Sequence, residues 1–244
     1  MRERNGFSLV ELLAALAVGM VMLLAIYGVV NVSQRSTSGI ERKVIAQQDA
    51  RAALGLMAME IRMASYNPSL NNGIWKDPGD CASAAACPLC KGIQEATANA
   101  IAVEMDIDGG GAGSGSIGDG PNEIIRYRYD AANQYITRET NCGGGQPFLG
   151  DKATSTNPRT VRVINDINGN GAFDAGTDIP LLRYFDGAGT EIFPTAGDQT
   201  PIPHIRRIDI ALAVETEDVD PNTHRRRRLI YATSVIPRNH APNL

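Results

Sequence analysis

GFSLVEL, at residues 6–12, opens an apolar run that continues to about Val32. A run of roughly 25 residues is long enough to cross a hydrocarbon core of about 30 Å as a helix. The run carries a carboxylate, Glu11, close to its start. An ionised carboxylate at bilayer depth costs on the order of 2.5–3.5 kcal/mol on insertion scales. We therefore interpret Glu11 as a functional residue.

Residues 1–6 form a short leader that carries two arginines and ends in Gly6. An ordinary secretory signal has a cleavage site of small residues after its apolar core, and the sequence has no such site after this run. Basic residues ahead of a span predict a cytoplasmic N-terminus. We expect one membrane pass, with the leader in the cytoplasm and the chain beyond about Val32 on the other side.

The N-terminal segment resembles the processing motif of type IV prepilins and type II secretion pseudopilins. The resemblance lies in the charged leader and in Gly6, Phe7 and Glu11. In that family a membrane peptidase cuts after the glycine, and the new N-terminal phenylalanine is methylated. The resemblance implies cleavage between Gly6 and Phe7, methylation of Phe7, and Glu11 as the fifth residue of the mature chain. It also implies insertion in the inner membrane with a periplasmic domain, followed by assembly into a pilus or pseudopilus that can reach the cell surface.

The charges at the mature N-terminus fit assembly of this kind. Cleavage would expose an ammonium group on Phe7, and the ammonium of a neighbouring subunit would neutralise Glu11. Opposite charges attract strongly in a low-dielectric medium, and loss of one partner is severe. The alternative is a membrane-anchored periplasmic enzyme in which Glu11 only reaches toward the membrane edge.

The helix is expected to continue past the membrane, over residues 7–66 in all. Apolar residues recur at steps of three or four along its second half and define one face: Ala50, Leu54, Met57, Ile61 and Ala64. Ser36 to Gly39 lowers helix propensity and suggests a flexible joint. Asn67-Pro68 predicts the end of the helix, because proline disfavours α geometry in the residue before it. Residues 50–54 and 59–66 resemble the helix of PilW-type minor pilins and the related J-type minor pseudopilins.

Residues 67–244 are expected to form a β-rich globular domain, because short apolar segments alternate with glycine-rich turns. The sequence therefore predicts an α+β, pilin-like fold with a long helix packed on an antiparallel sheet. The expected strands are residues 100–105, 123–129, 135–139, 159–164, 181–185, 205–215 and 228–236. A turn at residues 220–223 is expected to join the last two as a hairpin.

Four cysteines fall in the exported part of the chain: Cys81, Cys87, Cys90 and Cys142. An even number in an oxidising compartment predicts two disulfides, and three pairings are possible. The four thiolates are also a possible zinc set. A redox site at Cys87-Pro88-Leu89-Cys90 is the third alternative, but the surrounding sequence lacks the strand and helix that such a site needs.

Residues 166–178 match most of an EF-hand-type calcium loop. Oxygen side chains alternate, a glycine stands sixth and a carboxylate stands ninth. The expected ligands of this tentative calcium site are Asp166, Asn168, Asn170, Asp174 and Asp178. The twelfth position is Thr177, where a bidentate glutamate is usual. An ion-free turn rich in Asp and Asn is the alternative.

Asp106-Ile107-Asp108-Gly109 is a shorter echo of that pattern, with Asp119 as a further candidate ligand. Two carboxylates and a glycine are also common in ordinary turns. The densest charge cluster is basic, at residues 224–228, and we expect it to straddle a turn and the start of an edge strand. Without interleaved aromatic residues, and with a net charge of -4, binding to nucleic acid is not expected.

Motifs of hydrolytic active sites are missing, and the histidines form no recognisable catalytic set. We therefore expect a non-enzymatic minor pilin that helps to initiate a type IV pilus or sits at its tip, in pilus biogenesis, adhesion or motility. The alternatives are a minor pseudopilin of a type II secretion system and a calcium-dependent adhesin on a pilin anchor. The implied partners are the prepilin peptidase, other minor and major pilins, and the inner membrane before assembly.

Overall fold

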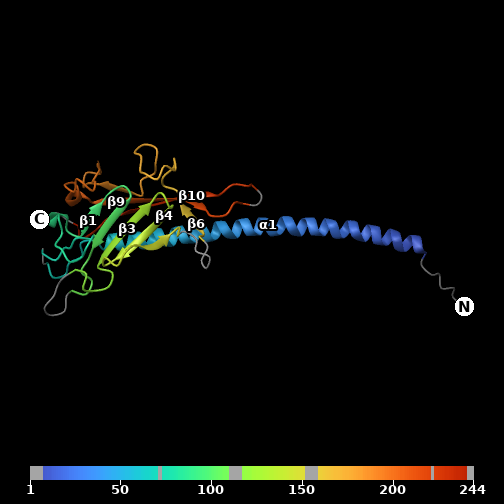
Figure 1. Cartoon of the computed structure of the whole chain (residues 1–244), viewed down its shortest axis with the longest axis horizontal. Helices are drawn as coiled ribbons and strands as arrows, with labels where there is room; N and C mark the ends of the chain where they lie inside the picture. The colour runs from blue at the N-terminus through green and yellow to red at the C-terminus, as the bar shows by residue number, and fades with distance from the viewer. Residues whose placement is uncertain (1–7, 71–72, 110–116, 152–158, 221–222, 241–244) are drawn as a thin grey trace.

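The computed structural model describes residues 8–70, 73–109, 117–151, 159–220 and 223–240 of the chain. A long N-terminal helix packs by its second half against two antiparallel sheets, and its first half projects beyond them (Figure 1). This arrangement is the α+β fold expected from the sequence, a long helix packed on antiparallel sheets.

Helix α1 spans Leu9–Arg62 and is 54 residues long, which corresponds to about 80 Å at a rise of 1.5 Å per residue. It passes through Ser36 and Gly39 without a break, so the expected joint is wrong. α1 ends before Asn67 because Ser65 adopts a left-handed backbone conformation with φ 65°. The Ser65 hydroxyl also donates to the carbonyl of Lys91. A residue in that conformation cannot continue a right-handed helix.

The first sheet has five strands in sequential order, each antiparallel to the next. Its strands are β1 (Ile93–Ala96), β2 (Ala100–Glu104), β3 (Ile124–Asp130), β4 (Tyr135–Thr140) and β5 (Gln146–Leu149). A short 3-10 helix, η1 (Pro88–Cys90), precedes β1. Strand β2 is buried along its whole length, whereas the central strand β3 alternates buried residues with more exposed ones such as Arg128.

The second sheet has the order β10-β9-β7-β8, and β6 also pairs with β9. Its strands are β6 (Val161–Val163), β7 (Leu182–Phe185), β8 (Glu191–Ile192), β9 (Arg207–Thr216) and β10 (Arg228–Val235). The 3-10 helix η2 (Ile202–His204) precedes β9. β9 and β10 form the predicted hairpin, which extends along α1 toward the helix N-terminus (Figure 1).

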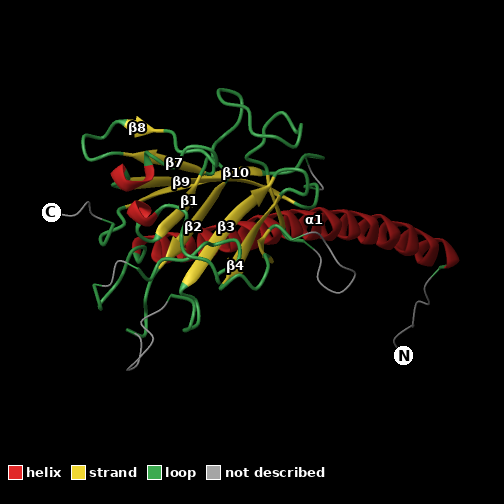
Figure 2. Cartoon of the chain, turned by 60° about the vertical axis from the view of Figure 1, so that its left-hand side comes forward, coloured by secondary structure: helices red, strands yellow, loops and turns green. Residues whose placement is uncertain are grey.

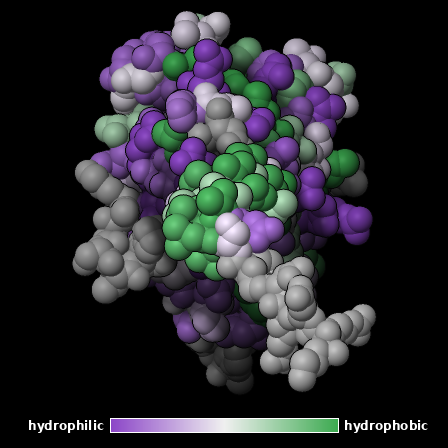
Figure 3. Space-filling model, turned by 90° about the vertical axis from the view of Figure 1, so that its right-hand side faces the viewer, coloured by the Kyte–Doolittle hydropathy of each residue, from purple (hydrophilic) through white to green (hydrophobic). Residues whose placement is uncertain are grey.

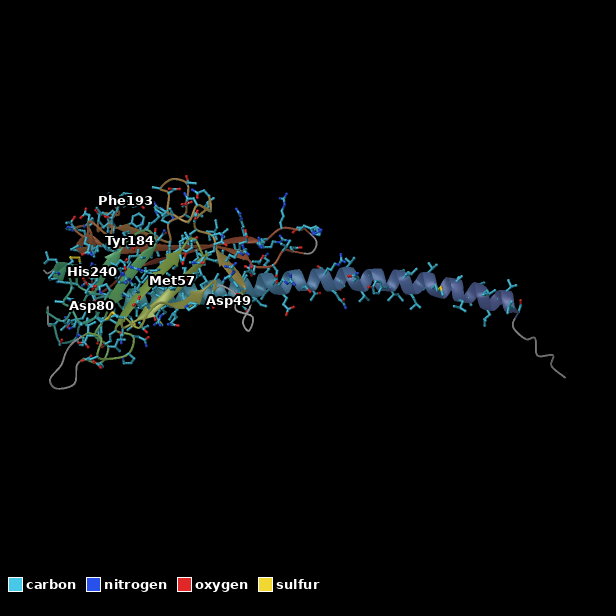
Figure 4. The ribbon with its side chains drawn as sticks, in the orientation of Figure 1. Asp49, Met57, Asp80, Tyr184, Phe193 and His240 are labelled. Atoms are coloured by element: carbon cyan, nitrogen blue, oxygen red, sulfur yellow. A yellow bond between two sulfur atoms is a disulfide. The ribbon has the colours of Figure 1, made fainter. Side chains whose placement is uncertain are left out.

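The face of α1 predicted from its periodicity is the face that packs. Ala50, Met57, Ile61 and Ala64 have no solvent exposure, and Leu54 is almost as buried. The helix lies against β5, β9 and β10, and both sheets are seen beside it in Figure 2. Met57 lies where the helix meets the strands (Figure 4). Alanine along this face lets the strands approach the helix backbone closely.

A buried polar link joins α1 to the first sheet. Glu60 of α1 accepts hydrogen bonds from the Tyr127 hydroxyl and from the Arg138 guanidinium, the latter at 2.6 Å. Burial, then the hydrogen bond to Glu60, raises the pKa of Tyr127 well above its usual value. Because removal of one partner from a buried ion pair leaves the other uncompensated, this link fixes the helix against β3 and β4.

Candidate assembly site at the helix N-terminus

Glu11 lies in the first turn of α1, where Ser8 is the N-cap residue. The Ser8 backbone N–H donates to Glu11 Oε2 at 3.0 Å, and the Val10 N–H donates to Ser8 Oγ at 3.2 Å. This is a capping box, which satisfies amide groups that have no partner within the helix. A carboxylate at this end also interacts favourably with the helix dipole. Within the described part of the chain, Glu11 Oε1 has no hydrogen-bond partner.

The surface of α1 beyond Glu11 is apolar and uncovered. Leu24 is 71% exposed and Val29 is 71% exposed. Figure 3 looks toward the N-terminal end of the helix and shows apolar side chains over its projecting part, surrounded by a mostly hydrophilic domain. Among the described residues, α1 is the one helix that is long and apolar enough to cross a membrane. Gly6 and Phe7, the predicted cleavage pair, lie outside the described residues.

The cysteines form two disulfides. One joins Cys81 to Cys142 and the other joins Cys87 to Cys90. Disulfides are therefore confirmed, and the pairing that the sequence left open is resolved in this structure. With each sulfur bonded to another, the four cysteines do not form a zinc site. Cys87 is the N-cap and Cys90 the last residue of the three-residue 3-10 helix η1, so the pair does not open an α-helix as a redox site would.

The loop at residues 166–178 lies between β6 and β7 and folds around its own polar groups. Asp166 accepts the N–H groups of Gly169 and Gly171, each at 2.7 Å. Asp174 Oδ2 accepts side-chain amides from Asn168 at 2.7 Å and Asn170 at 2.5 Å. The loop carboxylates Asp166, Asp174 and Asp178 are not among the groups of acidic side chains that converge closely enough to hold a metal ion in the described residues.

Asp178 is the carboxylate that follows the twelfth position of this loop. Its side chain accepts the Asp174 N–H at 2.7 Å and the Ile167 N–H at 2.9 Å. The hydrogen bond from the Asp174 N–H is the main cause that lowers the pKa of Asp178. Asp178 is therefore held ionised where the two ends of the loop meet.

Another acidic cluster is able to hold a metal ion. It combines Asp106 and Asp108 with Glu123, which the sequence analysis missed. Glu123 precedes β3 and is separated from Asp106 by a long loop, so no local spacing pattern joins them. The one sequence feature that could have indicated Glu123 was a carboxylate placed directly before an apolar strand. Asp119, the further candidate, is not in this cluster.

The basic run begins in the β9–β10 turn and continues into β10, which is an edge strand as predicted. Its arginines pair with acidic residues of the same hairpin: Arg227 lies 3.1 Å from Asp220, and Arg228 lies 3.0 Å from Glu215. The run therefore has an intramolecular role. Arg42 of α1 also pairs with Asp218 of the hairpin at 3.4 Å, but both side chains are exposed, so this contact adds little stability.

Residues 1–27 match the family model described as the prokaryotic N-terminal methylation motif. No curated protein matches the chain. Among solved structures, a type IV-like pilin from Thermus thermophilus matches with 12% identity and a TM-score of 0.40. That match covers 80% of this chain and 98% of the other.

The motif match covers the leader, the predicted cleavage pair and Glu11. An N-terminal apolar helix that carries this motif is consistent with a membrane-anchored pilin. Pilins are structural subunits and not enzymes, and the motif implies processing by prepilin peptidase and association with other pilins. The methylation motif, together with a long N-terminal helix packed on antiparallel sheets, supports a type IV pilin family for this chain.

Proposed function

We propose that the chain is a minor pilin, processed between Gly6 and Phe7, that helps to initiate a type IV pilus or sits at its tip. A minor pseudopilin of a type II secretion system is the alternative within the same class. In either role the leader faces the cytoplasm and the sheet domain faces the periplasm before assembly. The PilW-type resemblance in α1 supports a minor subunit.

The observation that carries this proposal is the state of Glu11. One carboxylate oxygen is held by the Ser8 N–H, while the other has no partner among the described residues. The apolar surface that follows it is uncovered. A second subunit packed along this surface would supply apolar contact, and its Phe7 ammonium would neutralise the carboxylate.

Two substitutions at Glu11 separate charge pairing from helix capping. Glutamine also serves at this position of a capping box, so Glu11→Gln keeps the cap and removes the charge, whereas Glu11→Leu removes both. We expect both variants to be absent from filaments sheared from cells, as measured by immunoblot. Glu41→Gln, an exposed change on the same helix, is the control. Normal recruitment of Glu11→Gln would exclude the charge-pair role.

Processing is tested separately. Gly6→Val is expected to retain the leader, which mass spectrometry of the purified chain detects as the uncut mass. Gly19→Ala is the control, because an added methyl group there meets nothing within 4 Å. Filaments that contain this subunit with residues 1–6 intact would contradict the proposed maturation.

The second candidate function is a calcium-dependent adhesin on the same anchor. It is supported by the position of the acidic loop, since Phe173, Gly176 and Asp178 line a groove of about 450 Å³ beside the exposed Phe193. The side-chain amides of Asn168 and Asn170 now donate to Asp174. Presenting their carbonyl oxygens to calcium would exchange the bonds that these oxygens accept from the Asn170 and Ala172 N–H groups. Asp166, Asn168, Asn170, Asp174 and Asp178 would then supply oxygen ligands.

Calcium titration of the full chain in detergent tests this second candidate. Asp166→Ala with Asp174→Ala is expected to abolish calcium-dependent protection of the loop from proteolysis. Asp186→Ala, in the turn after β7, is the control. Equal protection of wild type and the double variant at every calcium concentration would remove calcium from this loop.

A further inference from the structure

The loop between β2 and β3 leaves and rejoins the first sheet at one point. Asp106 lies two residues after β2, and Glu123 immediately precedes β3. One carboxylate oxygen from each of Asp106, Asp108 and Glu123 lies within 4.8 Å of the others. Three acidic groups from one end of a strand pair therefore converge on a small volume.

Two of these carboxylates are buried. Asp106 is 1% exposed and Glu123 is 0% exposed. Neither forms an ion pair with a lysine, arginine or histidine of the described residues. Burial of charge is costly unless the charge is paired or coordinates a metal, and nothing in the described protein neutralises this pair.

The strongest sign of a missing partner is Asp106 Oδ2. This oxygen is buried and has no hydrogen bond, although Asp106 Oδ1 accepts the Gly109 N–H at 2.8 Å. An unsatisfied buried acceptor is destabilising, and it is rare in native proteins unless water or an ion completes it. The orphan oxygen belongs to one of the three carboxylates of the cluster.

The protein holds the cluster in place with backbone groups. Glu123 accepts N–H groups from Ile107, Gly118 and Gly120 at 3.1, 2.9 and 2.9 Å. A side chain on Gly120 would place its first carbon 2.9 Å from Asp108 Oδ2. Glycine at this position therefore lets Asp108 and Glu123 approach each other.

The ligand chemistry selects calcium. All three groups offer oxygen, which suits hard cations and not zinc. Calcium takes about six to eight oxygen ligands in a flexible geometry, whereas magnesium demands a near-ideal octahedron and keeps several waters. Three carboxylates from one loop therefore suit calcium better than magnesium. We propose that Asp106, Asp108 and Glu123 form a calcium site, with exposed Asp108 at its mouth.

This site uses none of the residues of the loop at 166–178, and it is independent of processing and filament assembly. Bound calcium would tie the β2–β3 loop to the end of α1, because the Asp106 N–H donates to the Tyr66 carbonyl at 2.8 Å. Its role would be to stabilise the membrane-distal end of the domain.

Thermal unfolding of the full chain in detergent, with calcium or with chelator, is the first test. At a calcium concentration roughly 100-fold above Kd, we expect the wild-type midpoint to rise by about 5 to 10 °C. Asp106→Asn with Asp108→Asn should lose this rise. In chelator, the same variant should match or exceed wild type, because it carries less unpaired negative charge. An equal deficit with and without calcium would indicate a purely structural role and overturn the proposal.

Terbium luminescence is the second test and reports the location. Trp75 is the single tryptophan and packs with Ile117 and Ile124 beside the cluster, so excitation of Trp75 should sensitise a terbium ion bound there. We expect Asp108→Asn to abolish this emission, calcium to displace it, and Asp174→Asn in the other loop to leave it unchanged. Emission that is absent in wild type, or unchanged by Asp108→Asn, would overturn the proposal.

Discussion

The two disulfides are expected to differ strongly in their contribution to stability. Cys81–Cys142 closes a sequence separation of 61 residues, and Cys87–Cys90 closes one of 3. In the chain-entropy treatment, a bridge stabilises by restricting the unfolded chain, and the effect grows with the logarithm of loop length. These separations give about 4 kcal/mol for the long bridge and about 1.5 kcal/mol for the short one.

The perturbation is the paired replacement Cys81→Ser with Cys142→Ser, compared with Cys87→Ser with Cys90→Ser. The expected difference of about 2.5 kcal/mol corresponds to about 5 to 10 °C in unfolding midpoint for a chain of this size. Fluorescence of Trp75, which is 4% exposed, reports unfolding of the sheet domain without interference from the helix in detergent.

Wild type heated with reductant is the internal control, because it should unfold at or below the midpoint of the long-bridge variant. Equal losses for the two variants, or a larger loss for the short bridge, would refute the loop-entropy reasoning. That result would mean that contacts around each bridge, and not the constraint on the unfolded chain, set its contribution.

Two further predictions concern buried carboxylates. Glu60→Leu leaves Arg138 uncompensated and is expected to lower the free energy of unfolding by about 3 kcal/mol in denaturant titration. This is the low end for a buried pair, because Arg138 remains 22% exposed. Adding Arg138→Leu should recover much of the loss, and no recovery would show that the pair is not coupled. Burial raises the pKa of Glu104 to about 8 from 4.5. Between these values the folded chain holds a proton that the unfolded chain has released, so stability from this group falls as pH rises, by about 1.4 kcal/mol per pH unit. Glu104→Gln should therefore gain stability over wild type steadily from about pH 5 to about pH 8, and a constant difference across that range would contradict the raised pKa.

Most of the fold was readable from hydrophobic pattern. The buried face of α1 followed from its three-and-four spacing, and each expected strand is present with ends shifted by at most about two residues, as is usual for boundaries. The strands that the sequence analysis missed are β1, β5 and β8. β8 covers only two residues, β5 contains Pro147, and β1 mixes polar with apolar residues, so none presents a clear apolar alternation.

Contacts between segments far apart in the sequence could not be predicted in the same way. The division of the strands into two sheets depends on which segments meet in space, and no local pattern in the sequence encodes it. The same holds for Glu60, whose partners lie on β3 and β4, and for Glu123 beside Asp106. The helix end was placed a few residues late, because the left-handed conformation of Ser65 depends on its contact with Lys91. The candidate site at Glu11 could be predicted from the sequence because all of its residues are close together in the chain.

Because α1 is unbroken, the number of residues between its apolar half and its packed half sets how the sheets are rotated relative to Glu11. Each residue turns the chain by about 100°, so one residue inserted between Val32 and Ala46 would rotate the sheets by about 100° relative to Glu11. Seven inserted residues would lift the sheets by about 10 Å with only about 20° of rotation. In the proposed filament, the number of residues between Val32 and Ala46 would therefore set which side of the sheets faces the next subunit.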